Sequence, residues 1–358
     1  MSTSQDGLRL GILGTGGIVR LAVPQMQQFS GVRIAAIASR DQEKAAAAAR
    51  DLGIPTAYGS YEALLADPSL EAIYIALPIT LHTEWTLKAL AAGKHVLCEK
   101  PLAPSAAEAQ RVTEEAARRK LVAWEGFMVR HHPQWRAVSQ IIADGRIGTV
   151  RAVQGMLTRT PPNAFDPAAI ANRPDLGGGV LLDGGCYMVH LSRLAFGGEP
   201  QRVAAVADVE AAVGVATYFS AMMQFDQGVA SFTLSSRLRR FQRFLIVGTE
   251  GSLDVRVPVM PHATRATQVI ADYVDTPLTG DPEILEFGPV PSFRAQIENF
   301  VDSIRNGTPA PFDGHSSVAN ALALEALDNS ARHNGAWVNV AKAVTAQSVI
   351  ALDALVTA

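Results

Sequence analysis

The chain has 358 residues, of which 48% are hydrophobic and 18% are charged, and its net charge at pH 7 is −3. One hydrophobic core rarely serves so long a chain, so two domains are expected. No basic run suggests a nucleic-acid partner, and no stretch reaches the roughly 18 consecutive apolar residues of a membrane span. The start lacks the pattern of a signal peptide. With only two cysteines, Cys98 and Cys186, these features favour a cytoplasmic protein.

In the first 125 residues, short apolar runs alternate with helical stretches. The expected strands are Leu8–Leu13, Val32–Ala38, Glu71–Ala76, Lys94–Cys98 and Leu121–Trp124, and the expected helices are Gly17 to about Gln28, Asp41–Leu52, Leu81–Ala92 and Ser105–Lys120. Apolar strands separated by helices are typical of a parallel sheet covered by helices on both faces. The first part of the chain is therefore predicted to be a doubly wound α/β domain.

After about residue 150 the chain consists mainly of strands joined by short turns. The expected strands are Thr149–Thr158, Val203–Glu210, Thr217–Phe225, Val229–Ser236, Phe241–Val247 and Ser252–Val257, with hairpin connections at Asp226–Gly228 and Gly248–Gly251. Helices are expected at Asp183–Phe196, Phe293–Asn306 and Ser316–His333, and the tail Ala341–Ala358 is apolar at helical spacing. This pattern predicts a second, α+β domain with an open, mostly antiparallel sheet.

A glycine-rich segment joins the first strand to the first helix. Gly14 and Gly16 allow the backbone to turn tightly and to approach a pyrophosphate, which the amino end of the helix beginning near Gly17 favours. The third position of the dinucleotide fingerprint is Val19, which is a departure from glycine or alanine. Because the motif has a strand before it and a helix after it, it predicts a dinucleotide site.

The end of the second strand selects between the two nicotinamide cofactors. An acidic residue there binds the ribose hydroxyl of NAD, whereas Ser39 and Arg40 suit the 2′-phosphate of NADP. The sequence therefore favours NADP, and the neighbouring Asp41 leaves NAD open.

Other polar residues follow later strands at the same sheet edge. Lys100 comes after the strand that ends in Cys98, and a lysine there is placed to hydrogen-bond a substrate hydroxyl. Thr80 is a candidate cap of the next helix, and His82 either lines the cofactor site or is a packed structural residue. Arg130 follows the last strand and is expected to face the nicotinamide end.

The segment Gly177–His190 reads GGGVLLDGGCYMVH. On a helix, Asp183, Tyr187 and His190 share one face, because they are spaced four and then three residues apart. A carboxylate, a phenol and an imidazole on one face suggest acid–base chemistry, and an ordinary amphipathic helix is the alternative. The tyrosine is the expected proton donor or acceptor.

These motifs resemble the glucose–fructose oxidoreductase/inositol dehydrogenase (Gfo/Idh/MocA) family. The resemblance rests on Gly11–Gly17, on Glu99-Lys100-Pro101 and on the GGG-x-LLD-x-G-x-Y pattern, and it is greatest for the branch of dimeric dihydrodiol dehydrogenases and NADP-dependent D-xylose dehydrogenases. It implies a Rossmann domain at 1–126 and a substrate and oligomerisation domain at 127–340, and the helical tail expected at 341–358 follows these. It also implies hydride transfer between a nicotinamide and a sugar-like alcohol or carbonyl. Ile79 departs from the asparagine that the family often has.

The resemblance and the motifs together give the expected site. Catalysis is assigned to Lys100, Tyr187 and Asp183, with Tyr187 as the acid–base group and with Lys100 as the alternative. The expected cofactor contacts are Gly11, Gly14, Thr15, Gly16, Gly17, Ile18, Ser39, Arg40, Leu77, Pro78, Thr80, His82, Glu99, Lys100 and Arg130. The expected substrate contacts are Phe127, His132, Arg173, Asp183, Tyr187 and His190.

No cluster of ligands has metal spacing, so no metal is expected. Two other functions stay open: a glycoside hydrolase that retains its cofactor, and a non-catalytic NADP-binding regulator. Tyr218 and Met222 leave the second face of the strand Thr217–Phe225 without clear polarity, which suggests a homodimer or homotetramer formed through the C-terminal sheet.

Overall fold

The computed structural model describes residues 7–273, 281–308 and 314–342. The chain forms two compact units, which are described separately below. The first unit contains Met1–His131 and Pro291–Gly314, and the second contains His132–Val290 and His315–Ala358. The division expected from the sequence is continuous along the chain, whereas the contacts in the structure group Pro291–Gly314 with the first unit.

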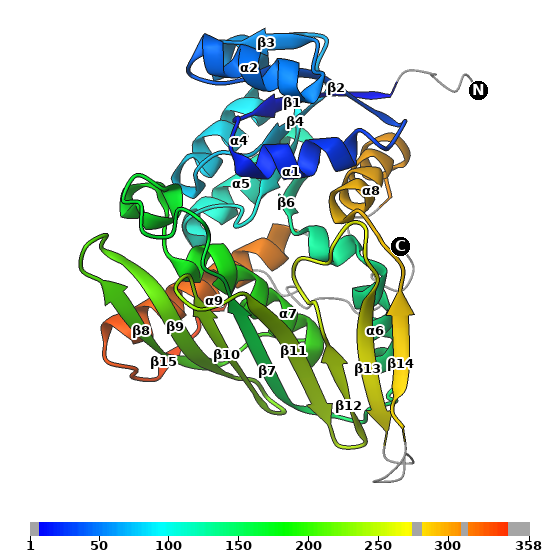
Figure 1. The fold of residues 1–358 in the computed structure, drawn as a ribbon, viewed down its shortest axis with the longest axis vertical. Coiled ribbons are helices and arrows are strands. Elements are labelled where there is room, and N and C mark those ends of the chain that lie inside the picture. Colours follow the sequence, from blue (N-terminus) through cyan, green and yellow to red (C-terminus); the bar gives the residue numbers. More distant parts are fainter. Residues whose placement is uncertain (1–6, 274–280, 309–313, 343–358) are drawn as a thin grey trace. The chain divides into compact units, whose positions relative to one another are not determined.

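The first unit is built on a six-stranded parallel sheet, which confirms the predicted Rossmann fold (Figure 1). The strand order is β3-β2-β1-β4-β5-β6, the order of a dinucleotide-binding sheet. The strands are β1 (Leu8–Leu13), β2 (Val32–Ala38), β3 (Thr56–Tyr58), β4 (Ala72–Ile75), β5 (His95–Glu99) and β6 (Ala123–Gly126). The helices are α1 (Gly17–Met26), α2 (Gln42–Leu52), α3 (Tyr61–Leu65), α4 (His82–Ala91), α5 (Ala106–Arg119) and α8 (Ser292–Asn306).

Local sequence signals fix most of these boundaries. Ser105 accepts a hydrogen bond from the Glu108 backbone N–H and so caps α5, while Gly53 ends α2 in the left-handed conformation. Strands β1 and β4 are almost wholly buried, as their continuous apolar runs predict, whereas the edge strand β3 is partly exposed. The N-cap residue of α4 is Leu81 rather than Thr80, because a 3₁₀ turn over Ile79–Leu81 precedes that helix.

Helix α8 comes from far along the chain and packs against α1 (Figure 1). The Phe293 backbone N–H donates to the Gln25 side chain at 3.3 Å, and Arg305 forms an ion pair with Glu71 at 2.7 Å. The first unit is therefore completed by residues more than 160 positions beyond its last strand.

The second unit is built on a nine-stranded sheet in the order β14-β13-β12-β11-β7-β10-β9-β8-β15. Only β10 and β7 pair in parallel, so the predicted mostly antiparallel sheet is confirmed. Both expected hairpins are present, joining β9 to β10 and β11 to β12. The strands are β7 (Val150–Thr158), β8 (Arg202–Glu210), β9 (Val215–Gln224), β10 (Val229–Ser235), β11 (Phe241–Gly248), β12 (Gly251–Val255), β13 (Thr267–Tyr273), β14 (Glu283–Phe287) and β15 (Val338–Asn339).

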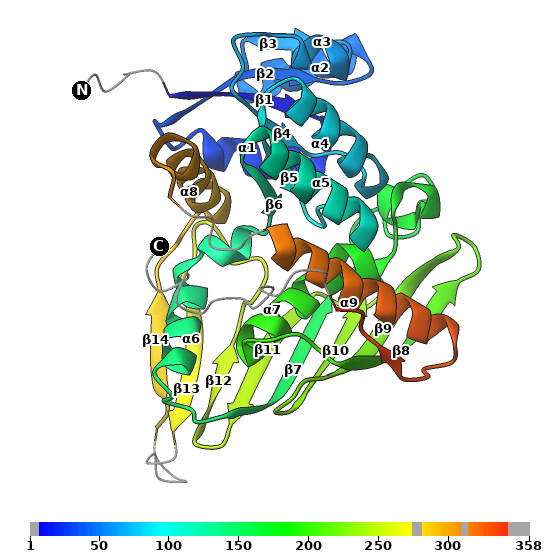
Figure 2. The same cartoon turned by 180° about the vertical axis from the view of Figure 1, so that it is seen from behind.

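Three helices cover one face of this sheet, namely α6 (Pro133–Ala143), α7 (Cys186–Phe196) and α9 (Gly314–Arg332) (Figure 2). The inner face of β9 carries Phe219 and Met223, which are buried. Tyr218 and Met222 point to the opposite face and are 36% and 46% exposed. That outer face is therefore apolar and open to solvent in this chain.

The helix expected at Asp183–Phe196 is divided in the structure. Leu181–Gly185 form a π-helical turn, and the α-helix begins only at Cys186. The α-helical spacing used for Asp183 was therefore wrong, because this residue lies in the wider turn, where the i, i+4 relation does not apply. Residues 343–358 of the expected helical tail lie outside the described residues.

Candidate active site

The glycine loop between β1 and α1 is shaped for close approach by a ligand. Gly14 has φ of +110°, and a Cβ there would collide with the Ala76 carbonyl oxygen, so only glycine fits. A Cβ at Gly16 or Gly17 would meet nothing within 4 Å. Helix α1 has no side-chain cap at Gly16, which leaves its first N–H groups available for a phosphate. The loop therefore fits the pyrophosphate of a dinucleotide.

The third fingerprint position is filled by a tightly packed side chain. Val19 is fully buried in the first turn of α1. The loop residues Thr15 and Ile18 next to it are only partly buried. The valine thus replaces the usual small residue and still keeps the helix against the sheet.

The tip of β2 carries the residues expected to choose the cofactor. Asp41 caps α2, because its Oδ1 accepts hydrogen bonds from the backbone N–H groups of Glu43 and Lys44 at 2.9 and 3.1 Å. Ser39 is buried and its hydroxyl accepts from the Asp41 N–H at 3.3 Å. Arg40 is exposed. The carboxylate nearest the tip is thus engaged in helix capping, while Arg40 is exposed with its guanidinium beside the Tyr61 hydroxyl.

His82 is tied to two backbone segments of the same sheet edge. Its Nδ1 lies 2.8 Å from the Pro101 carbonyl oxygen and its Nε2 lies 2.9 Å from that of Leu77. Burial lowers the pKa of this histidine, and the charge of Lys100 lowers it further. A neutral imidazole has one N–H and donates it to one of these two carbonyl oxygens, and the His82 ring lies between the segment after β4 and the segment after β5.

The segment after β5 contains the expected catalytic lysine. Glu99 ends the strand, is buried, and accepts a hydrogen bond from the Tyr74 hydroxyl at 2.6 Å. Lys100 is half-buried and Pro101 follows it. The lysine therefore stands at the carboxyl end of β5, at the same sheet edge as the glycine loop.

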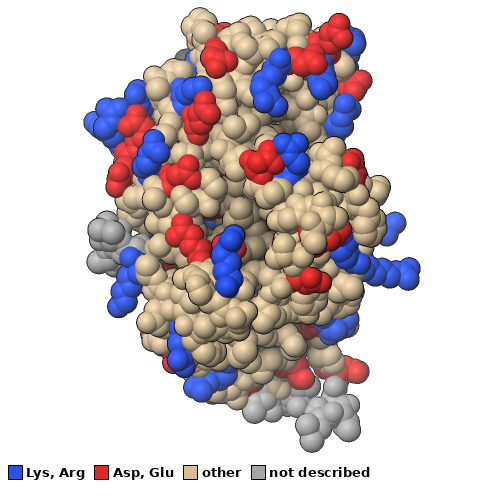
Figure 3. All heavy atoms as spheres, turned by 90° about the vertical axis from the view of Figure 1, so that its left-hand side faces the viewer, with Lys and Arg blue, Asp and Glu red and all other residues tan. Residues whose placement is uncertain are grey.

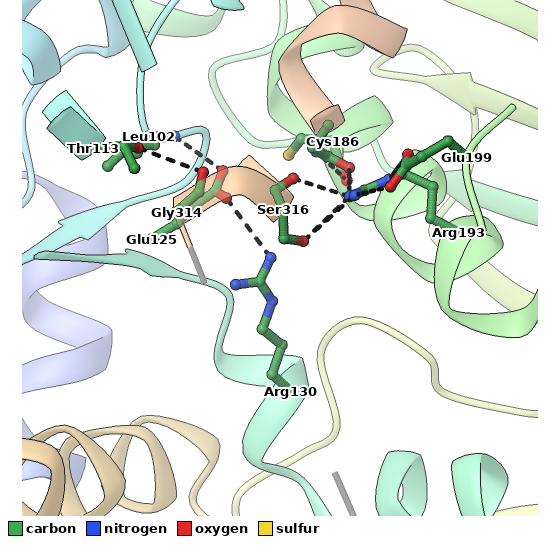
Figure 4. A network of polar contacts seen from close by, with 10 residues as sticks. Leu102, Thr113, Glu125, Arg130, Cys186, Arg193, Glu199, Gly314 and Ser316 are labelled. Carbon is green, nitrogen blue, oxygen red and sulfur yellow. Dashed lines mark hydrogen bonds and ion pairs between the residues drawn. The ribbon is translucent and has the colours of Figure 1, made fainter. Parts of the chain in front are cut away.

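The segment after β6 carries a buried ion pair (Figure 4). Arg130 Nη2 lies 3.7 Å from Glu125 Oε2, and both side chains are at most 5% exposed. Glu125 Oε1 also accepts from the Leu102 N–H at 3.0 Å, and the Arg130 guanidinium lies over the Phe127 ring. Phe127 is fully buried. This pair joins the segments after β5 and β6 into one rigid edge.

The second unit holds the other expected catalytic residues. Asp183 lies in the π-helical turn and forms an ion pair with Arg159 at 3.0 Å, and both side chains are about half exposed. Tyr187 and His190 lie three residues apart on α7 and are 7% and 0% exposed. π-Helical turns occur often at functional sites, and here the turn presents Asp183 to solvent while α7 buries the two residues that follow.

A buried network fixes the beginning of α7 (Figure 4). Arg193 is fully buried and forms two hydrogen bonds with the Glu199 carboxylate, at 2.6 and 2.7 Å. The same guanidinium donates to Asn320 of α9, whose amide donates to the Cys186 carbonyl oxygen at 3.2 Å. Helix α9 therefore holds the residue that directly precedes Tyr187.

The two remaining substrate candidates have other local roles. His132 is fully buried, and its Nδ1 caps α6 by accepting from the Gln134 N–H at 3.2 Å. Arg173 is exposed and forms a two-pronged pair with Asp175.

Sequence reasoning did not identify Arg159 or Asn320. Arg159 follows β7 directly, at a position where arginine is usually solvated, and only the fold shows that it reaches Asp183. No local pattern in the sequence signals either pairing.

The charged surface has no dominant sign on the face drawn in Figure 3, where basic and acidic side chains are interspersed. Within the described ranges, no group of three or more histidine, cysteine or acidic side chains is arranged to hold a metal ion. Among the same residues, no helix is both long and apolar enough to cross a bilayer.

A parallel sheet in this order, with an open glycine loop at its carboxyl edge, defines a dinucleotide-binding protein. Residues 8–127 match the oxidoreductase family with an NAD-binding Rossmann fold, and residues 135–254 match the GFO/IDH/MocA C-terminal domain. The chain belongs to this GFO/IDH/MocA oxidoreductase family, which confirms the expected family and enzyme class.

Individual relatives cover nearly the whole chain. An uncharacterised oxidoreductase of Rhizobium meliloti is 38% identical over 94% of this chain and 100% of its own length. A D-xylose 1-dehydrogenase (NADP(+)) of Haloferax volcanii is 37% identical over 92% of this chain and 99% of its own. The structure of a 3-ketoreductase from Actinomadura kijaniata in complex with NADP and TDP-benzene superimposes with a TM-score of 0.82, at 29% identity, covering 90% of this chain and 98% of that one.

Proposed function

We propose that this protein transfers hydride between NADP and a sugar or sugar-like alcohol or carbonyl. The observation that carries the proposal is the uncapped amino end of α1 beside Gly16 and Gly17, on the same sheet edge as Lys100. The D-xylose dehydrogenase and the 3-ketoreductase named above support both the cofactor and the substrate class. The nicotinamide supplies the hydride chemistry, and the protein supplies binding, orientation and proton transfer.

The preference for NADP over NAD rests on the tip of β2. Asp41 caps α2 and so has one carboxylate oxygen engaged by backbone N–H groups. Arg40 is exposed next to it and suits a 2′-phosphate, which a guanidinium binds with two parallel hydrogen bonds. Dissociation constants for NADP and NAD, measured on the wild-type protein, test this preference directly.

We assign proton transfer to Tyr187, with Lys100 as the cation that favours its ionised form. Asp183 hydrogen-bonds the substrate or orients Lys100. Structures of the Actinomadura kijaniata relative include variants with a tyrosine replaced by phenylalanine and with a lysine replaced by alanine or glutamate, the same two residue types. Tyr187 is nearly buried on a helix whose start is fixed by Asn320, so its position is well defined.

The remaining contacts proposed from the sequence follow the sheet edge. The cofactor is proposed to contact Gly11, Gly14, Thr15, Gly16, Gly17, Ile18, Ser39, Arg40, Leu77, Pro78, Thr80, His82, Glu99, Lys100 and Arg130. The substrate is proposed to contact Phe127, His132, Arg173, Asp183, Tyr187 and His190. Phe127, His82 and His132 are buried in this structure, so direct contact by these residues requires their backbone atoms or local opening.

The activity is tested by following NADPH and NADH absorbance with aldoses, inositols, dihydrodiols and keto-sugars. Turnover with at least one class is expected, and Tyr187→Phe should lower kcat by a factor of about 10² or more, as loss of a positioned acid–base group does. Unchanged kcat in that variant would transfer the role to Lys100. Hydrolysis of glycosides without net cofactor turnover would identify the cofactor-retaining hydrolase instead, and binding without any turnover would favour the regulator.

We also propose that the protein is a cytoplasmic homodimer or homotetramer that associates through the outer face of the nine-stranded sheet. That face has a hollow of about 730 Å³, and its rim exposes Met156, Val206, Met222 and Phe241. Large exposed apolar patches are typical of association surfaces. Light scattering should give a dimer or tetramer mass, and Met222→Lys should shift it towards the monomer. A monomer mass for the wild type would refute the proposal.

A further inference from the structure

The ion pair between Arg159 and Asp183 is held by a well-anchored piece of backbone. Arg159 directly follows β7, and its N–H donates to the Ser235 carbonyl oxygen at 2.9 Å. The next residue, Thr160, donates its hydroxyl to the Leu238 carbonyl oxygen at 2.8 Å. The guanidinium is therefore carried by a segment fixed to the end of β10 and to the turn at 236–240.

The exposure of this pair leaves it available to a ligand. The Arg159 and Asp183 side chains are 54% and 46% exposed. A pair so exposed contributes only about 0–1 kcal/mol to stability, so stability alone does not account for it. Arginine has five N–H donors, and the Asp183 carboxylate takes one of them at 3.0 Å, so the half-exposed guanidinium has further donors to offer beside that carboxylate.

Two arginines of the second unit, one in the turn at 236–240 and one in the loop tied to it, are paired with carboxylates. Arg237 binds Glu210 at 2.7 Å and also donates to Asn172, which ties the turn at 236–240 to the loop that contains Arg173. Arg173 is in turn paired with Asp175. A phosphate group that used Arg237 or Arg173 would therefore have to compete with a carboxylate that is already bound to that arginine.

We propose that Arg159 is a specificity-determining residue that, together with Asp183, binds two neighbouring hydroxyl groups of an uncharged polyhydroxy substrate. The carboxylate accepts hydrogen from one hydroxyl group, and the guanidinium donates to the oxygen of the next. This inference rests on the proposed function and names the substrate class for it. Arg239 and Arg240 are exposed in the same turn, so a phosphorylated sugar is the competing class that the experiment must test.

The experiment compares the wild type with Arg159→Gln, Arg159→Lys and the control Arg332→Gln. Arg332 forms an exposed pair with Asp328 on α9 and has no proposed contact with substrate. The ligands are D-xylose, D-glucose, 2-deoxy- and 3-deoxy-D-glucose, and D-glucose 6-phosphate. For each variant, KM and kcat are measured with NADP, and sugar binding to the NADP-loaded protein is measured separately by saturation-transfer NMR.

Arg159→Gln should raise KM for D-glucose about tenfold or more, the usual effect of losing a hydrogen bond to a charged group. The KM for NADP should change less than twofold, Arg159→Lys should restore part of the loss, and Arg332→Gln should match the wild type. The rise in KM caused by Arg159→Gln should be smaller for the deoxy sugar that lacks the contacted hydroxyl, because the substitution and the missing hydroxyl then remove the same interaction. The wild type should prefer D-glucose to its 6-phosphate.

An unchanged KM in Arg159→Gln for every sugar, or a preference for D-glucose 6-phosphate, would overturn the inference. If no sugar is oxidised, the proposed function fails, and the NMR binding comparison still decides whether Arg159 selects uncharged sugars. Thermal unfolding of each variant separates a loss of binding from a loss of folding, and the charge-conserving Arg159→Lys provides a second test if the glutamine variant does not fold.

Discussion

Acidification should destabilise this protein measurably through His132. The imidazole is fully buried, burial lowers its pKa to about 4, and its Nδ1 accepts the capping hydrogen bond of α6. A proton on Nδ1 would remove that cap and would bury a charge. Nε2 has no hydrogen-bond partner among the described residues, so nothing compensates that charge.

The sign and size of the effect follow from the two pKa values. The pKa of His132 is 6.5 in the unfolded chain and about 4 in the folded protein. At a pH between these two pKa values, the unfolded chain binds a proton that the folded chain does not. The stability contributed by neutral His132 is thus complete above about pH 6.5 and is lost as the pH falls towards about 4. The difference of about 2.5 pKa units corresponds to about 3 kcal/mol, of which about 2 kcal/mol is lost by about pH 5.

Urea unfolding of the wild type and of His132→Asn, at about pH 7.5 and about pH 5, measures this effect. Asparagine keeps an oxygen that caps the helix and does not titrate. Burial also lowers the pKa of His82 and His95, and their contributions are common to both proteins. The wild type should lose about 2 kcal/mol more than the variant. Equal losses in the two proteins would refute the reasoning.

Three further results are expected. Gly14→Ala should reduce the free energy of unfolding by about 1–3 kcal/mol in a melting experiment, because φ is positive at this residue and the new Cβ would collide with the Ala76 carbonyl oxygen. Gly16→Ala should instead leave the melting temperature within about 2 °C and weaken NADP binding. Arg193→Leu should cost about 3 kcal/mol in urea unfolding, because the Glu199 carboxylate loses its buried partner. Arg40→Ala should raise the Kd of NADP at least tenfold and that of NAD less than threefold, and equal changes would reassign the 2′-phosphate site.

Five of the six strands of the parallel sheet could be predicted from the sequence, although β6 begins two residues later than the expected Leu121. The apolar runs Leu8–Leu13 and Val32–Ala38 have the boundaries that the structure shows, because strands buried on both faces read as uninterrupted hydrophobic segments. Apart from Gly11, which lies inside β1, the expected cofactor residues lie at or after the carboxyl ends of the strands, as the topology dictates once the strand order is known.

Other elements gave no comparable signal. Strands β13 and β14 carry alternating polar residues and lie at the sheet edge, and β3 is only three residues long, so their patterns resemble those of loops. The π-helical turn was not predictable, because its residues are as apolar and glycine-rich as those of an ordinary helix start. The pairing of Arg159 with Asp183 depends on tertiary contacts between residues 24 positions apart.

The return of α8 to the first unit has a consequence for how this protein is made. A ribosome that has synthesised the chain to His131 has translated every strand of the parallel sheet, yet the helix that packs on α1 is more than 150 residues from being translated. The surface of α1 around Gln25 therefore lacks its contact with α8 until the strands of the nine-stranded sheet that precede α8 have been translated. The nucleotide-binding unit is thus completed late in synthesis. A fragment that ends after β6 would lack α8, which covers α1 in the full chain.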